Sequence, residues 1–193
     1  MKICVFGASG DELRQEYFDD AERLGELIAD GGHTLVFGGG ATGLMGAAAR
    51  GAYRRGGELI GVAPTFFNEP DVLYEHCTSL IFTETMSQRK SAMEDAADAF
   101  VILPGGIGTL EEFFETLTLK QLGRHSKPMA LLNTLGYYDA LTALLEGAVE
   151  GGFLGGSCLS LFALCATPEQ ALAHSASAEQ PRDGSRGLRD YNK

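Results

Sequence analysis

Residues 100–117 read FVILPGGIGTLEEFFETL, and this stretch decides the fold class. The apolar run 100–103 has the length of a buried β-strand, and the glycine-rich loop 104–109 ends it. In the helix that follows, the inner face carries Leu110, Phe113, Phe114 and Leu117. A short buried strand, a glycine-rich loop and an amphipathic helix in this order are typical of a βαβ unit.

The same order repeats along the chain on both sides of this stretch. Further strands are expected at residues 2–6, 34–37, 59–62, 80–82, 129–132 and 159–164, and helical patterns separate most of them. Parallel strands that are joined by right-handed helical crossovers form an open sheet. We therefore predict an α/β fold, a doubly wound parallel sheet with helices on both faces.

Length and charge limit the classes of protein that fit. The 193 residues suit a single domain, which we expect to span residues 1–174. In residues 175–193 only four of nineteen side chains are apolar, so we expect a disordered tail there. Lys and Arg total 15 against 26 Asp and Glu, and the net charge of −11 argues against nucleic acid as a partner.

Other sequence features indicate a cytoplasmic protein without a membrane partner. No apolar run approaches the ~20 residues of a membrane helix, and the first apolar run is too short for a signal peptide. The four cysteines form no C-x-x-C pair, which favours reduced thiols. The four histidines show no metal-ligand spacing, and we expect neither a metal nor a cofactor.

Glycine is over-represented, with 26 residues, and three clusters hold much of the excess, at 7–10, 38–46 and 105–109. Each cluster follows an expected strand, where α/β folds bind their ligands. Glycine there lets several backbone N–H groups approach an anion such as phosphate. The alternative explanation of these glycines is that they form tight turns that need positive φ angles. This explanation is less favoured, because all three loops lie on one edge of the expected sheet.

The second cluster resembles a dinucleotide-binding motif. Residues 38–43, GGGATG, match G-x-G-x-x-G, and Glu58 follows Gly38 by 20 positions, near the spacing of a ribose-binding acid. That acid belongs at the carboxyl end of a strand, however, and Glu58 precedes its strand. The motif also follows the second strand and not the first, so a dehydrogenase is disfavoured.

Glu111 and Glu112 follow the third glycine cluster, in what we expect to be the first turn of a helix. A carboxylate there stays ionised through the helix dipole, and it could bind ribose hydroxyls or stabilise positive charge on a sugar ring. The two side chains leave the helix about 100° apart, so they need not share a role. The alternative to a functional carboxylate is an acid that only caps and stabilises the helix.

Arg89 and Lys90 lie where the preceding helix is expected to begin, near Met86. Cations are unfavourable at a helix N-terminus, and such violations of a local rule occur at functional sites. Arginine offers a planar fork to phosphate or ribose oxygens, and lysine a compact charge. A solvated pair is the alternative.

These motifs together resemble the Lonely Guy family, the cytokinin riboside 5′-monophosphate phosphoribohydrolases, which are often mislabelled lysine decarboxylases. They are G-G-G-x-x-G-L-M-G at 38–46, Arg89-Lys90 and P-G-G-x-G-T-x-x-E at 104–112, and the similarity runs from Lys2 to about Phe153. The resemblance implies a Rossmann-like homodimer with active sites completed near the subunit interface. It also implies hydrolysis of a nucleoside 5′-monophosphate to the free base and ribose 5-phosphate.

The resemblance also implies roles for particular residues. Arg89 and Glu112 would form the catalytic pair. Lys90, Thr118 and Glu69 would assist substrate binding. The remaining substrate-binding residues would be the glycine-loop residues Gly39, Gly40, Gly105, Gly106, Ile107, Gly108 and Thr109, with 105–109 holding the 5′-phosphate.

Two departures from plant members concern the base pocket. Ser87 replaces a usual His, and Leu119 replaces a usual Trp. The preferred base therefore stays open, and AMP and isopentenyladenosine monophosphate are both candidate substrates. A purine nucleotide nucleosidase of salvage and a non-catalytic nucleotide carrier or sensor of the same fold are the alternatives. The decarboxylase label has no chemical support, because no lysine stands in the context of a pyridoxal phosphate site.

Overall fold

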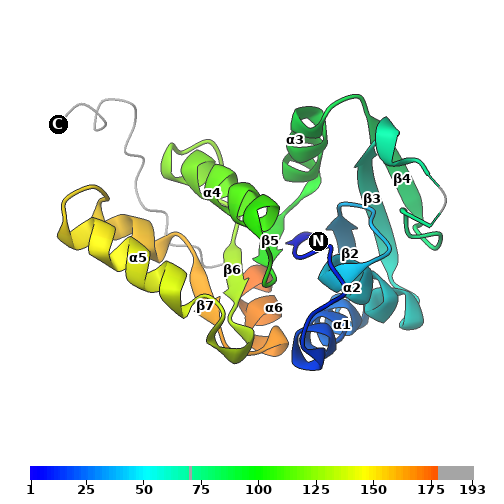
Figure 1. Cartoon of the computed structure of the whole chain (residues 1–193), viewed down its shortest axis with the longest axis horizontal. Coiled ribbons are helices and arrows are strands. Elements are labelled where there is room, and N and C mark those ends of the chain that lie inside the picture. Colours follow the sequence, from blue (N-terminus) through cyan, green and yellow to red (C-terminus); the bar gives the residue numbers. More distant parts are fainter. Residues whose placement is uncertain (70, 178–193) are drawn as a thin grey trace.

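The computed structural model describes residues 1–69 and 71–177. Within them, seven parallel strands form one sheet in the order β4-β3-β2-β1-β5-β6-β7. The strands are β1 (Lys2–Phe6), β2 (Thr34–Phe37), β3 (Glu58–Pro64), β4 (Ser79–Thr83), β5 (Ala99–Ile102), β6 (Met129–Leu132) and β7 (Ala163–Cys165). The predicted doubly wound α/β fold is confirmed (Figure 1).

Six helices in the described part of the chain cover both faces of the sheet. They are α1 (Gln15–Asp30), α2 (Gly43–Arg54), α3 (Met86–Ala96), α4 (Ile107–Gln121), α5 (Asp139–Glu150) and α6 (Pro168–Ala176). Alternation along each strand divides the core: Ile3 and Val5 face α1, α2 and α6, whereas Cys4 and Phe6 face α3, α4 and α5 (Figure 1). None of these helices has the length and apolar character needed to cross a membrane.

The strand order places a ligand-binding crevice beside β1. The chain winds from β1 through β2 and β3 to β4, then crosses back to β5 on the other side of β1. Loops that leave β1 and β5 in opposite directions open a crevice at their carboxyl ends. All three glycine clusters lie at this edge, within a few residues of the ends of β1, β2 and β5.

The end of the domain differs from the expectation in two places. The last strand is shorter and begins later than the expected 159–164: residues Gly156–Ser160 form a 3₁₀ turn, and Ala163–Cys165 pair with β6. The apolar pattern there reflects packing in an irregular segment, since Cys158 is buried within the turn. Ser175, where the tail was expected to begin, is buried in α6, and residues 178–193 lie outside the described part.

Candidate active site

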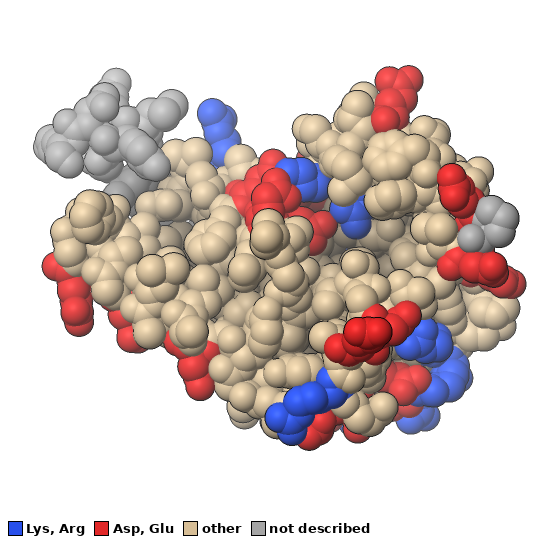
Figure 2. All heavy atoms as spheres, viewed as in Figure 1, with Lys and Arg blue, Asp and Glu red and all other residues tan. Residues whose placement is uncertain are grey.

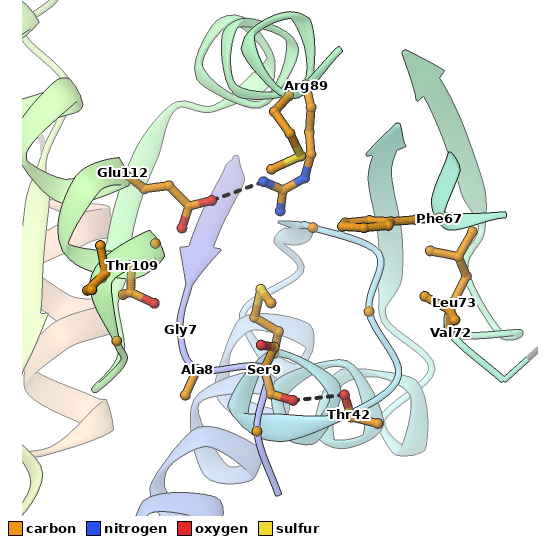
Figure 3. A pocket seen from close by; sticks show the side chains of 18 residues that line it. Gly7, Ala8, Ser9, Thr42, Phe67, Val72, Leu73, Arg89, Thr109 and Glu112 are labelled. Atoms are coloured by element: carbon orange, nitrogen blue, oxygen red, sulfur yellow. Dashed lines mark hydrogen bonds and ion pairs between the residues drawn. The ribbon is translucent and has the colours of Figure 1, made fainter. Parts of the chain in front are cut away.

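A hollow of about 570 Å³ opens at the carboxyl edge of the sheet, between the loops after β1, β2 and β5 and the beginnings of α3 and α4. Figure 2 shows acidic and basic side chains meeting near it, where α3 faces α4. Residues of all three glycine clusters line it (Figure 3). The expectation that the three clusters share one edge is therefore confirmed.

Arg89 and Glu112 form a buried ion pair at this hollow (Figure 3). Nη1 of Arg89 donates to Oε1 of Glu112 at 3.0 Å, and Nε donates to the Val62 carbonyl at 3.1 Å. Only 5% of Arg89 and 9% of Glu112 is exposed, so Arg89 is not a solvated surface cation. The two groups can act as one unit, in which the arginine holds the carboxylate in place.

The beginning of α3 tolerates this arginine because the helix is capped independently. Thr85 accepts a hydrogen bond from the Gln88 backbone N–H at 3.2 Å, and the Gln88 side chain accepts one from the Thr85 N–H at 3.3 Å. This capping box satisfies two backbone donors that the helix leaves open. Arg89 can therefore turn inward to the carboxylate.

The electrostatics of Glu112 differ from the expectation. The helix α4 begins at Ile107, which puts Glu112 in its second turn, where the helix dipole contributes little. Burial raises the pKa of the Glu112 carboxyl above its ordinary value, and Arg89 is the main group that opposes this rise. Lys90 opposes it more weakly, whereas Glu111 adds to it. The guanidinium, and not the dipole, is what favours the ionised form.

The beginning of α4 is built to receive an anion. Its N-cap is Gly106, and residues Gly106, Ile107, Gly108 and Thr109 line the hollow. The first backbone N–H groups of a helix have no partner within that helix, and they carry a partial positive charge. Gly105 does not line the hollow, but its carbonyl accepts a hydrogen bond from the Tyr137 hydroxyl at 2.5 Å.

The beginning of α2, by contrast, is filled by the chain itself. The Gly43 N–H donates to a carboxylate oxygen of Asp11 at 2.8 Å, and the Leu44 N–H donates to the Ala8 carbonyl at 2.8 Å. The backbone donors that would bind a pyrophosphate in a dinucleotide site are thus already used. Glu58 lies at the amino end of β3, where it accepts a hydrogen bond from Thr34 at 2.6 Å. Both findings exclude the dehydrogenase arrangement.

Some expected substrate-binding residues do not line the hollow. Lys90 forms ion pairs with Glu111 and, at 2.6 Å, with Glu115, on the outer side of α4. Thr118 lies on the same outer side, in a shallow surface hollow with Glu111, Phe114, Glu115 and Leu119. Gly40 does line the site, whereas Gly39 and the exposed Glu69 do not.

The apolar wall of the hollow was not predicted from the sequence. Phe67, Val72 and Leu73 form this wall, on the side away from Thr109 and Glu112 (Figure 3). They belong to the segment between β3 and β4, in which Phe67 ends a 3₁₀ turn, Thr65–Phe67, and whose sequence has no strand or α-helical periodicity. The one signal for this wall in the sequence is the pair of adjacent phenylalanines, Phe66-Phe67, in a segment without periodicity.

Comparisons with known proteins identify relatives of this chain. Residues 45–175 match a family described as possible lysine decarboxylase. A probable cytokinin riboside 5′-monophosphate phosphoribohydrolase of Oryza sativa subsp. japonica is 43% identical over 161 residues, which are 83% of this chain and 71% of that protein. The Arabidopsis thaliana enzyme named LOG2, a cytokinin riboside 5′-monophosphate phosphoribohydrolase, is 39% identical over 153 residues, 79% of this chain and 72% of that protein.

A solved structure shares the fold. The Moco carrier protein of Chlamydomonas reinhardtii superposes with a TM-score of 0.68 at 27% identity, covering 89% of this chain and 93% of that chain.

Proposed function

Because this chain belongs to the Lonely Guy family, whose family model carries the description possible lysine decarboxylase, we propose that it hydrolyses adenosine 5′-monophosphate, plain or modified at N6. The products are the free base, a cytokinin where the base is N6-modified, and ribose 5-phosphate. The observation that carries the proposal is the buried Arg89–Glu112 pair in the same hollow as the open beginning of α4.

The hollow provides a place for each part of such a substrate. The backbone N–H groups at Gly106, Ile107 and Gly108 suit the 5′-phosphate. The apolar wall suits the base, and it would accept an apolar substituent at N6. The ribose then lies between them, beside Glu112. Anchoring both ends positions the glycosidic bond and supplies binding energy remote from it.

The reaction follows from the charge of Glu112. As the C1′–N bond breaks, its electron pair leaves with the base, and C1′ becomes positively charged. The Glu112 carboxylate stabilises this charge and takes a proton from the attacking water. The water oxygen bonds to C1′, and a proton is returned to the base. Arg89 keeps the carboxylate ionised and oriented before the bond breaks.

The proposal includes a cytoplasmic homodimer. The outer side of α4 supports it, because Phe114, which was expected on the inner face, is 37% exposed there, next to Thr118 and Leu119. In a dimer through this face, Thr118 would lie at the subunit interface. Light scattering coupled to gel filtration tests the homodimer, and a monomeric mass at micromolar concentration would contradict it.

The function is tested by incubating the protein with AMP and with isopentenyladenosine monophosphate, and by measuring the free base by chromatography. The corresponding nucleosides, which lack the phosphate, are the controls. We expect base release from a monophosphate and little from its nucleoside. Faster release from AMP would favour a nucleosidase of salvage. Binding of a nucleotide without any hydrolysis would contradict the proposal and favour a carrier; the similar Chlamydomonas protein is named a Moco carrier.

A further inference from the structure

We propose that Gly38 is a positioning residue for Arg89: the absence of a side chain at position 38 creates the space that the guanidinium occupies beside Val62 and Glu112. This inference rests on the proposed function for the role of Arg89 in turnover. It assigns a role to Gly38, the first glycine of the run 38–43, which the phosphate-binding geometry of α4 leaves unexplained.

The distances at Gly38 leave no room for a methyl group. A Cβ atom on Gly38 would lie 2.0 Å from Nη2 of Arg89 and 3.1 Å from its Cζ, against 3.4 Å or more for ordinary contact. The guanidinium would have to retreat by more than 1 Å. Its Nε donates a hydrogen bond to the Val62 carbonyl at 3.1 Å, and its Nη1 donates one to Oε1 of Glu112 at 3.0 Å. A retreat of this size therefore breaks the ion pair with Glu112 or the hydrogen bond to Val62.

The backbone at Gly38 does not itself require glycine. Its φ angle lies outside the left-handed region, whereas that of Gly39 is +77°. After the two Arg89 atoms, the next nearest atom to a Cβ at position 38 is the Met45 sulfur, at an ordinary 3.4 Å. The close approach of Arg89 is therefore the feature that excludes a side chain at this position.

Gly40 provides a matched comparison in the same loop. It also lines the hollow and has no left-handed φ angle, but a Cβ atom there would meet nothing within 4 Å. A methyl group at Gly40 alters the wall of the hollow without touching Arg89. Its effect must then be the same whether position 89 holds arginine or lysine.

The test is a double-mutant cycle on turnover. Because a misplacement of about 1 Å can cost about 10²-fold in rate, Gly38→Ala should lower kcat by about ten-fold or more. In an Arg89→Lys background, which lacks the branched head, the same change should cost less than about two-fold. Gly40→Ala should act equally in both backgrounds. In Gly38→Ala the acid limb of the pH–rate profile should also move to higher pH, because Arg89 no longer stabilises the Glu112 carboxylate.

Thermal unfolding repeats the cycle without relying on activity. Gly38→Ala should lower Tm by about 3 °C or more in the wild-type background and leave it unchanged in the Arg89→Ala background. An equal loss of Tm in these two backgrounds would overturn the inference, and so would an equal loss of kcat in the wild-type and Arg89→Lys backgrounds. Failure of the proposed function gives a different result, since the unmodified protein would then release no base.

Discussion

Arg89 and Glu112 are 23 residues apart in the chain, yet Nη1 of one donates to Oε1 of the other at 3.0 Å inside the fold. The first follows β4 and the second follows β5, so the sheet brings both helix beginnings to one edge. Each charge is buried only because the other is present. Stability, pH dependence and turnover are therefore coupled at this pair.

The first prediction is that Arg89→Ala abolishes turnover and also destabilises the fold. Removing one partner leaves the Glu112 carboxylate buried without its cation, which costs about 3 kcal/mol for a pair of this kind. The carboxyl responds by binding a proton, so the loss of stability should shrink as the pH falls. Urea unfolding of both proteins at pH 7 and pH 5 measures this difference. A loss that is the same at both pH values would contradict the assignment.

The second prediction concerns the pH dependence of turnover. Burial raises the pKa of Glu112, and only the ionised form can stabilise the developing charge on the ribose. We therefore expect kcat at saturating substrate to fall as the pH is lowered, with an apparent pKa above the ordinary value of a glutamate carboxyl. Other charges near Glu112 are Lys90 and Glu111, and the buried Cys4 thiol on β1 has a raised pKa that keeps it neutral. A kcat that stays constant down to pH 4 would argue against this role.

The third prediction is that Tyr137→Phe weakens binding of the phosphate. The Tyr137 hydroxyl donates to the Gly105 carbonyl at 2.5 Å. The C=O and N–H of a trans peptide point in opposite directions, so this bond fixes the Gly106 N–H on the other side. Losing one such hydrogen bond costs about 1 kcal/mol of binding free energy, which weakens the affinity by about five-fold. We expect KM for the monophosphate to rise by that factor.

Inhibition by ribose 5-phosphate provides the control for this variant. Its inhibition constant should rise by the same factor as KM, because both ligands use the same loop. A rise in KM without a change in this constant would show that Tyr137 acts on another part of the substrate.

The fourth prediction is that His125 makes the fold sensitive to acid. Its Nδ1 accepts from the Lys127 N–H at 3.2 Å, so its Nε2, 3.0 Å from the Thr116 carbonyl, carries the proton. Burial lowers the pKa of this ring, and the nearby Lys120 and Lys127 lower it further. The unfolded chain therefore binds the proton more readily, and stability is lost as the pH falls through about 6.5.

His125→Gln should remove this part of the pH dependence. The difference in the free energy of unfolding between wild type and variant should decrease from pH 7.5 to pH 5.5. A difference that does not change over this range would show that the ring is free to accept a proton in the fold.

Much of this architecture could be predicted from local sequence patterns. The buried run 100–103 and the glycine loop after it defined β5 and the ligand-binding edge, because strand and turn signals lie within a few residues. Helical geometry also predicted that Glu111 and Glu112 point in different directions, whereas the choice of Glu112 came from the family resemblance alone. Glu112 faces the hollow, whereas Glu111 pairs with Lys90 outside.

The remaining features depend on contacts between distant segments. Lys90 was expected near the substrate, but two carboxylates of α4 hold its ammonium group on the outer side. The apolar wall around Phe67 belongs to a segment without periodicity, so only the folded chain shows which way it faces. The space at Gly38 is likewise visible only once Arg89 has been placed.

The most direct test of the account compares Glu112→Gln with Glu111→Gln. Both changes remove one charge at neighbouring positions of α4, but only Glu112 lies in the hollow beside Arg89. Removing a preorganised charge of this kind typically costs about 10²–10³ in rate. We predict that loss of base release for Glu112→Gln and nearly normal turnover for Glu111→Gln, with both folds confirmed by circular dichroism. Normal turnover in Glu112→Gln, or equal losses in the two variants, would contradict the account.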